Sequence, residues 1–259
     1  MVNLKDRYGP WALIAGASEG VGSSAASLLA DAGINLVLVG RKQQTLDELG
    51  ASLPVETRSL VLDLNTPDAA QKLAESTADL EIGLLIYNTG APGCVPPRSF
   101  LSEAVTHWQE IVSRNAMTVT TACHHFGGRM VARGRGGIVL VGSTAGWAGT
   151  ENMAIYCATK AFQRGLAESL WAEWRQHGVD VLAMVLGVTD TPAFRRIMAG
   201  VEVEGAADCD VIARDMMAAL PDSGPTWPAG PEPFGEHTRR DAVLGRNKQR
   251  STMFARHES

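Results

Sequence analysis

Short runs of apolar and β-branched residues recur along this chain, and longer segments with a helical pattern separate them. The runs are almost continuously apolar, which is typical of strands that helices cover on both faces. Strands that alternate with helices form a parallel sheet with crossover connections. The sequence therefore predicts an α/β fold, a doubly wound parallel sheet, with strands at residues 11–15, 34–39, 57–62, 82–87, 137–142 and 179–186.

Two long segments carry the strongest helical patterns, residues 100–133 and 153–177. In the second, apolar side chains recur at three- and four-residue intervals, which predicts one continuous helix face. We expect this stripe to lie in the core or at a subunit interface. It consists of Phe162, Leu166, Leu170 and Trp174.

The composition changes after Val188. Residues 189–220 are predicted to form a helical insertion, and prolines and glycines then crowd a loop around a short strand at 226–229. The tail at about 235–259 is rich in arginine, which indicates either an anion site or, more commonly, a solvated end. Because no repeat or linker divides the chain, residues 1–259 are predicted to form a single domain.

Composition excludes several classes of protein. The chain has 259 residues, of which 45% are hydrophobic and 20% charged, so it can bury a large core without disulfides. A formal net charge of −5 gives no positive field for nucleic acid. The longest apolar runs are far shorter than the roughly 20 residues of a membrane span. The sequence predicts no nucleic-acid partner and no membrane span.

The cysteines and histidines predict neither disulfides nor a metal site. The four cysteines are scattered, and the polar amino terminus lacks the pattern of a secretory signal, so we expect reduced thiols in a cytoplasmic protein. Adjacent His124 and His125 cannot share one helix face, and no further ligand follows at metal-binding spacing. The cysteines are Cys94, Cys123, Cys157 and Cys209.

A glycine-rich turn follows the first predicted strand and leads directly into a helix. Glycines let the backbone turn sharply and approach a pyrophosphate, whose charge the free amides of a helix amino terminus stabilise. This context predicts a Rossmann-like dinucleotide site, although a purely structural turn is the alternative. The candidate cofactor-binding residues of the turn are Gly16, Ser18, Gly20, Val21 and Gly22.

The second predicted strand ends in a cation where a site selective for NAD would present an acidic residue. Arg41 follows this strand, and its planar guanidinium can pair with a 2′-phosphate. The sequence therefore predicts a preference for NADP(H), with NAD(H) as the second candidate. The alternative is that Arg41 is simply a solvated residue at the sheet edge.

Polar residues follow the third and fourth predicted strands. Ligands bind at the carboxyl ends of strands in open parallel sheets, so Asp63 and Leu64 are candidates for the adenine contact. Asn88 and Gly90 are candidates for the adenosine ribose. Ordinary turn formation explains each of them equally well.

Three residues carry the candidate chemistry. Tyr156 and Lys160 are four residues apart, which on a helix places both side chains on one face. A nearby ammonium favours the phenolate and makes a tyrosine usable as an acid and base. Ser143 ends the fifth predicted strand and can hold a substrate oxygen while Tyr156 exchanges its proton. Tyr156 and Lys160 are also placed beside the cofactor.

These motifs resemble those of the short-chain dehydrogenase/reductase superfamily over essentially the whole chain. The resemblance covers the glycine loop, Asp63, the turn at Asn88, Ser143 and the Tyr-x-x-x-Lys motif. It implies a fourth catalytic residue, Asn115, which in the family holds a water in a proton relay through the lysine. It also implies that Thr191, with Thr189 nearby, reaches the nicotinamide carboxamide.

The chain departs from the family pattern at four positions. Ala15 replaces a threonine before the glycine loop, and Tyr87 and Thr89 replace an asparagine and an alanine of the Asn-Asn-Ala-Gly turn. Leu186 replaces a proline after the sixth strand, which restores a backbone amide and frees one torsion. We expect these changes to affect the fine geometry of the cofactor site.

Two functions fit these features. The first is an oxidoreductase that transfers a hydride between NADP(H) and a carbonyl or secondary alcohol, with a hydrophobic ketone as the expected substrate. The second is a non-catalytic dinucleotide-binding redox sensor or regulator. The presence of Ser143, Tyr156, Lys160 and Asn115 favours the enzyme.

The substrate side is the least specific part of the sequence. Residues 91–97 and the insertion are mostly apolar, and we expect them to flank the site, although helical packing explains the insertion equally well. The resemblance implies a homodimer or homotetramer through the two long helices, and Trp171 and Trp174 fit such a surface. The apolar residues of the insertion are Phe194, Ile197, Met198, Met216 and Met217.

Overall fold

The structure is a computed structural model, and it describes residues 3–89, 98–147, 149, 151–197, 205–221 and 224–229. Three of the predictions lie outside these ranges: the apolar segment at 91–97 together with Gly90, the position of Met198, and the basic tail at 235–259.

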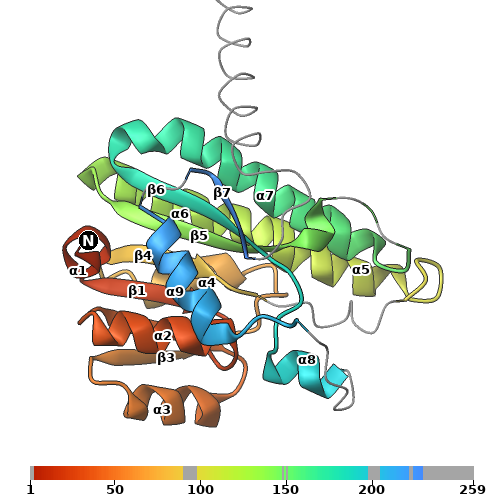
Figure 1. The fold of residues 1–259 in the computed structure, drawn as a ribbon, viewed down its shortest axis with the longest axis horizontal. Helices are drawn as coiled ribbons and strands as arrows, with labels where there is room; N and C mark the ends of the chain where they lie inside the picture. Colours follow the sequence, from red (N-terminus) through yellow and green to blue (C-terminus); the bar gives the residue numbers. More distant parts are fainter. Residues whose placement is uncertain are drawn as a thin grey trace, which may run out of the picture.

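Seven parallel strands form one sheet in the order β3-β2-β1-β4-β5-β6-β7 (Figure 1). The predicted doubly wound, Rossmann-like fold is confirmed. The chain order reverses between β1 and β4, so the carboxyl ends of these two strands border the crevice where such sheets bind ligands. The strands are β1 Trp11–Ala15, β2 Asn35–Gly40, β3 Thr57–Val61, β4 Ile82–Tyr87, β5 Gly136–Ser143, β6 Val179–Leu186 and β7 Thr226–Ala229.

Helices cover both faces of the sheet (Figure 1). Along β1, Leu13 points into a cluster with Phe126 and Trp171, and Ile14 points into a second cluster with Leu29 and Met216. Successive strand side chains point to opposite faces, so a continuously apolar strand needs both layers. The helices are α1 Leu4–Tyr8, α2 Val21–Asp31, α3 Gln43–Ser52, α4 Ala69–Ser76, α5 Val105–Val112, α6 Val119–Arg133, α7 Ala154–Trp174, α8 Pro192–Ile197 and α9 Cys209–Ala219.

The first long helical segment differs from its prediction. It begins at Val105 instead of residue 100, and a π-helical turn, Ser113–Thr118, separates α5 from α6. The second segment matches its prediction as α7 followed by a 3₁₀ turn, Arg175–His177.

The predicted stripe of α7 is one position away from its buried face. Phe162 is 43% exposed, whereas the buried residues include Lys160, Gln163, Ala167 and Trp171. Leu166, Leu170 and Trp174 are partly buried and pack at the edge of the same core. The Trp174 ring lies against Gly127 of α6, where a Cβ atom would come within 2.4 Å of it. Trp171 and Trp174 therefore pack in the protein itself, and their suggested place in a subunit interface stays a prediction.

The insertion contains α8 and α9, which serve different purposes. Met216 and Met217 of α9 are buried in the core beside α2. Helical packing explains these two methionines, one of the two readings that the sequence left open. Over the described part of the chain, no helix is both long and apolar enough to span a bilayer.

Candidate active site

The glycine loop between β1 and α2 has a backbone that other residues cannot adopt easily. Gly16 and Gly20 have φ values of 86° and 62°. A Cβ atom on Gly22 would lie 2.0 Å from the Gly16 carbonyl oxygen. The Asn88 side chain holds this turn by donating from Nδ2 to the same oxygen over 3.1 Å. The loop therefore brings glycine backbone to the amino end of α2, the arrangement that accepts a pyrophosphate.

Ser18 lies against the end of β2. A Cβ atom on Gly40 would come within 2.3 Å of the Ser18 Oγ, and the exposed Arg41 follows directly. A hydroxyl and a guanidinium therefore lie at the strand end next to the glycine loop. These residues fit a dinucleotide that carries an additional phosphate, since phosphate oxygens accept from both groups.

The remaining candidates for cofactor binding lie at the same sheet edge, and several have local partners. Asp63 is exposed, and its Oδ1 accepts from the Asn65 amide over 3.0 Å. Leu64 is buried, and its carbonyl accepts from the Thr118 hydroxyl. Turn formation thus accounts for part of the geometry at Asp63.

The insertion contacts the glycine loop through α8. Thr191 Oγ1 accepts from the Phe194 amide over 3.0 Å near the start of this helix. The Thr191 methyl group lies 3.0 Å from the place of a Cβ on Gly20. Thr189 is buried and donates to the Gly187 carbonyl.

An ion pair adds a second contact between α8 and the loop. The Arg196 Nη2 atom lies 2.5 Å from Glu19 Oε1, and Nη1 lies 2.9 Å from Oε2. Both side chains are exposed, so the pair contributes little to folding. It does hold α8 over the loop.

Tyr156 and Lys160 lie together in the first turns of α7. The Lys160 Nζ is 5.9 Å from the centroid of the Tyr156 ring. Ser143 lies half-buried at the end of β5, and its Oγ accepts from the Ala145 amide. Lys160 donates to Val141 of the same strand over 2.8 Å. The structure therefore brings the lysine to the tyrosine and to the strand that carries the serine.

The ammonium of Lys160 is buried among carbonyl oxygens. The residue is 3% exposed, and Nζ also donates to Gln163 Oε1 over 3.0 Å and to the Thr89 carbonyl over 3.4 Å. A buried charge is stable only when hydrogen bonds replace its water. These acceptors therefore let a charged lysine stay inside the protein.

Asn115 lies in the π-helical turn and is fully buried. Its Nδ2 donates to the Thr159 hydroxyl over 3.1 Å. The π register leaves carbonyls for other donors: the Asn115 carbonyl accepts from Gln163 Nε2 over 3.0 Å, and the Arg114 carbonyl accepts from the Tyr87 hydroxyl over 2.7 Å. The structure thus joins Asn115 to Lys160 through a side chain.

Gln163 is the site residue that sequence reasoning missed, and Tyr87 appeared there only as a departure from the family pattern. Gln163 is 1% exposed. It lies about one helical turn after Lys160, on the same helix face as the Tyr-x-x-x-Lys motif, and this spacing is the sequence signal that could have identified it. Tyr87 is also buried, and burial raises the pKa of its phenol far above the usual range. Tyr87 therefore stays protonated and can donate to the π turn.

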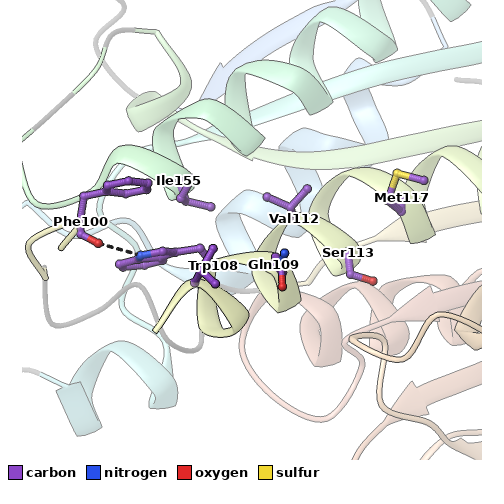
Figure 2. A pocket seen from close by; sticks show the side chains of 8 residues that line it. Phe100, Trp108, Gln109, Val112, Ser113, Met117 and Ile155 are labelled. Carbon is purple, nitrogen blue, oxygen red and sulfur yellow. Dashed lines mark hydrogen bonds between the residues drawn. The ribbon is translucent and has the colours of Figure 1, made fainter. Parts of the chain in front are cut away.

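An apolar groove lies along α5 and the π turn, next to the start of α7 (Figure 2). Its volume is about 320 Å³, and its lining includes Phe100, Trp108, Val112 and Ile155. The Trp108 indole donates to the Phe100 carbonyl over 2.9 Å. Tyr156 itself packs against the cluster of Trp108 and Ile111. Trp108 therefore lies both at the groove and in the cluster against which Tyr156 packs.

Two cysteines of the described chain have raised pKa values, and Cys209 Sγ lies 3.8 Å from the place of a Cβ on Gly20. Burial raises the pKa of the Cys123 thiol to about 12 and, with nearby carboxylates, that of Cys209 to about 11. In the described ranges, no three side chains of the metal-binding types gather in one place.

Comparison with known proteins places the chain among dehydrogenases. The family model of short chain dehydrogenases matches residues 10–202. The chain is 32% identical to a 7beta-hydroxysteroid dehydrogenase of Clostridium sardiniense over 198 residues, which is 74% of each protein. It is 38% identical to a very-long-chain 3-oxoacyl-CoA reductase of Podospora anserina over 182 residues, 68% of this chain and only 53% of that relative.

A solved structure of a short-chain dehydrogenase also matches this chain over most of its length. The short-chain dehydrogenase from Sphingobium yanoikuyae, in complex with NADPH, superimposes with a TM-score of 0.79 at 28% identity. The match covers 94% of this chain and 95% of that protein.

Proposed function

The chain belongs to the short-chain dehydrogenase/reductase family and is an oxidoreductase of carbonyls and alcohols, and we propose that it uses NADP(H) to interconvert a hydrophobic ketone and its secondary alcohol. One observation carries the proposal. The buried Lys160 ammonium lies 5.9 Å from the ring of Tyr156, at the sheet edge that also carries the glycine loop.

Tyr156 is the proposed acid and base. When bound, the nicotinamide supplies or accepts the hydride. In reduction the Tyr156 phenol gives its proton to the carbonyl oxygen, and in oxidation the phenolate takes it from the alcohol. The Lys160 charge favours the ionised phenol. Ser143 donates a hydrogen bond to the same substrate oxygen and orients it.

Ser18 and Arg41 are the proposed determinants of NADP(H) preference. Ser18 lies against Gly40 at the end of β2, and Arg41 follows it. The guanidinium can bind a 2′-phosphate through two parallel hydrogen bonds. The NADPH bound to the Sphingobium yanoikuyae relative supports this preference. NAD(H) is the second candidate.

The apolar residues packed around Tyr156 support a hydrophobic substrate. Tyr156 packs against the buried Trp108 and Ile111, with Ile155 beside it. The two curated relatives are named for a hydroxysteroid and a very-long-chain 3-oxoacyl-CoA, and the steroid skeleton and the acyl chain are both apolar. We therefore propose a lipophilic ketone, steroid or acyl derivative.

The exposed apolar side chains along α5 and the π turn support a homodimer or homotetramer. Val105 and Met117 are each 65% exposed, and Val112 is 37% exposed. Apolar surface of this kind is typical of a subunit contact. Sedimentation of the full chain tests this part of the proposal, and a monomer at all concentrations would overturn it. A cytoplasmic location stays a prediction from the cysteine pattern.

The experiment that tests the function is a substrate screen. The purified chain is mixed with NADPH and a panel of steroid, long-chain and small ketones, and the loss of NADPH absorbance is followed. We expect turnover that increases with the apolar size of the ketone. Tight NADPH binding without turnover of any ketone or alcohol would favour the sensor instead, and absence of NADPH binding would remove both.

A further inference from the structure

Gln163 bridges two groups of the candidate site with the two ends of one amide. Its Oε1 accepts from Lys160 Nζ over 3.0 Å, and its Nε2 donates to the Asn115 carbonyl over 3.0 Å. Gln163 is 1% exposed. A buried amide with both ends bonded is held in one orientation, because turning it would place donor against donor and acceptor against acceptor.

The Gln163 side chain restricts the position of the Lys160 ammonium. A lysine has a long, flexible side chain with three N–H donors on its ammonium. The Val141 carbonyl is fixed by β5, and Gln163 Oε1 adds an acceptor from α7 itself. Asn115, on the π turn, fixes the other end of Gln163. The ammonium is therefore held between a strand and two helical segments.

We propose that Gln163 is a positioning residue: its amide holds the Lys160 ammonium in the place from which the ammonium acts on Tyr156. The same amide occupies the space between the ammonium and the Asn115 carbonyl. The inference rests on the proposed function for its catalytic meaning. An amide neither gains nor loses a proton near neutral pH. The Gln163 side chain consequently passes no proton itself, and the Asn115 carbonyl anchors its amide; the water relay that the family resemblance implies at Asn115 stays a prediction.

Two substitutions separate this role from packing. Gln163→Met keeps the length of the side chain but removes the donor and the acceptor. Gln163→Ala leaves a space between two polar groups, which a water can enter and bridge. A polar bridge predicts that Met is the more harmful residue, whereas a packing role predicts that Ala is, because it leaves the larger cavity.

The readout is the ionisation of Tyr156, which requires no turnover. The chain has three tyrosines, and the difference in tyrosinate absorbance between each protein and its Tyr156→Phe counterpart isolates this phenol. We expect Gln163→Met to raise the midpoint of tyrosinate formation by about one pH unit, the size of effect that a displaced neighbouring charge produces. Gln163→Ala should raise it by less than half as much.

Other ionisable groups on α7 and on the elements packed against it stay the same in all variants. They include Arg114 in the π turn, bonded to Asn65 over 2.7 Å, and the Arg164–Glu168 pair, with 3.4 Å between its charged atoms. The further groups are His107 and Glu110 on α5, Asp180 on β6, Tyr87 on β4, Arg175 and His177 after α7, and Cys157 and Glu173 on α7. Gln176→Met, at an exposed glutamine, is the matched control and should shift nothing.

Turnover adds a second measurement. For alcohol oxidation at neutral pH, a shift of one unit lowers the ionised fraction and kcat about tenfold, and raising the pH should restore the rate of Gln163→Met. An unchanged tyrosinate midpoint in Gln163→Met, or a larger shift in Gln163→Ala than in Gln163→Met, would overturn the proposal. If the parent oxidises no alcohol and reduces no ketone, the proposed function fails, while the tyrosinate titration still decides the role of Gln163.

Discussion

Substitution of Gly22 by alanine tests the glycine loop most sharply. The new Cβ would lie 2.0 Å from the Gly16 carbonyl oxygen and 2.7 Å from Asn88 Nδ2. Contacts of this kind need more than 3 Å, so the loop must move by about 1 Å or more, and the Asn88 hydrogen bond to Gly16 must break. We expect overpacking and the lost bond to cost about 3 kcal/mol of folding free energy.

Cofactor binding should suffer more than folding. Displacing the Gly16 carbonyl changes the backbone that receives the pyrophosphate, and we expect NADPH affinity to fall at least about 100-fold, as for the loss of two charge-assisted hydrogen bonds. The assays are urea denaturation and titration of NADPH fluorescence. Unchanged NADPH affinity in Gly22→Ala would refute the reasoning.

The matched control is Gly165→Ala. Gly165 lies within α7, and no atom comes within 4 Å of the place of its Cβ. Alanine is the better helix former by about 1 kcal/mol, so this variant should be more stable than the parent and should bind NADPH equally well. A destabilised Gly165→Ala would mean that the space around these glycines is misjudged.

Three further predictions concern side chains. Arg41→Ala should weaken NADPH binding about 10- to 100-fold, the worth of a charge-assisted contact, and leave NADH binding unchanged; equal loss for both cofactors in titrations would contradict it. Tyr87→Phe removes the donor to the buried Arg114 carbonyl and should lower the free energy of unfolding by about 1–3 kcal/mol, measured by urea denaturation. A loss below about 0.5 kcal/mol, the scatter of neutral substitutions, would contradict this prediction. Arg196→Gln breaks the pair with Glu19 and should speed NADPH dissociation up to about fivefold in stopped-flow experiments while stability is unchanged; an unaltered rate would show that α8 does not retain the cofactor.

The sheet was predictable because its signal is local and strong. Each predicted strand is a short run of apolar residues with glycine, proline or polar neighbours, and the structure has a strand at every predicted place. The strand at 226–229 was also anticipated, and it pairs with β6. Burial on both faces follows from the missing alternation, and the two core clusters confirm it.

The buried face of α7 was harder to predict because it is partly polar. Tyr156, Lys160 and Gln163 follow the helical repeat, but hydrophobicity rules assign charged and amide side chains to the surface. The apolar stripe through Phe162 therefore looked more like the core. Only tertiary contacts, the carbonyl oxygens around Lys160 above all, show why polar groups can be buried here.

The π turn and its contacts were also beyond the sequence. No residue type marks a π register, and the bond between Tyr87 and the Arg114 carbonyl joins residues 27 positions apart. The resemblance to the family named Asn115, but the partner of its carbonyl, Gln163, came only from the structure. The structural role of Tyr87, a departure from the family pattern, is evident only from the π turn that it contacts.

The central claim is that Tyr156 exchanges the proton while the dinucleotide is bound. Its most direct test is a single comparison of the parent with Tyr156→Phe, both saturated with NADPH and the best ketone of the screen. Loss of a general acid predicts at least a 10²-fold fall in turnover, up to about 10⁴-fold, with NADPH affinity within about threefold of the parent. A Tyr156→Phe protein that still reduces the ketone at a rate near that of the parent would contradict the claim.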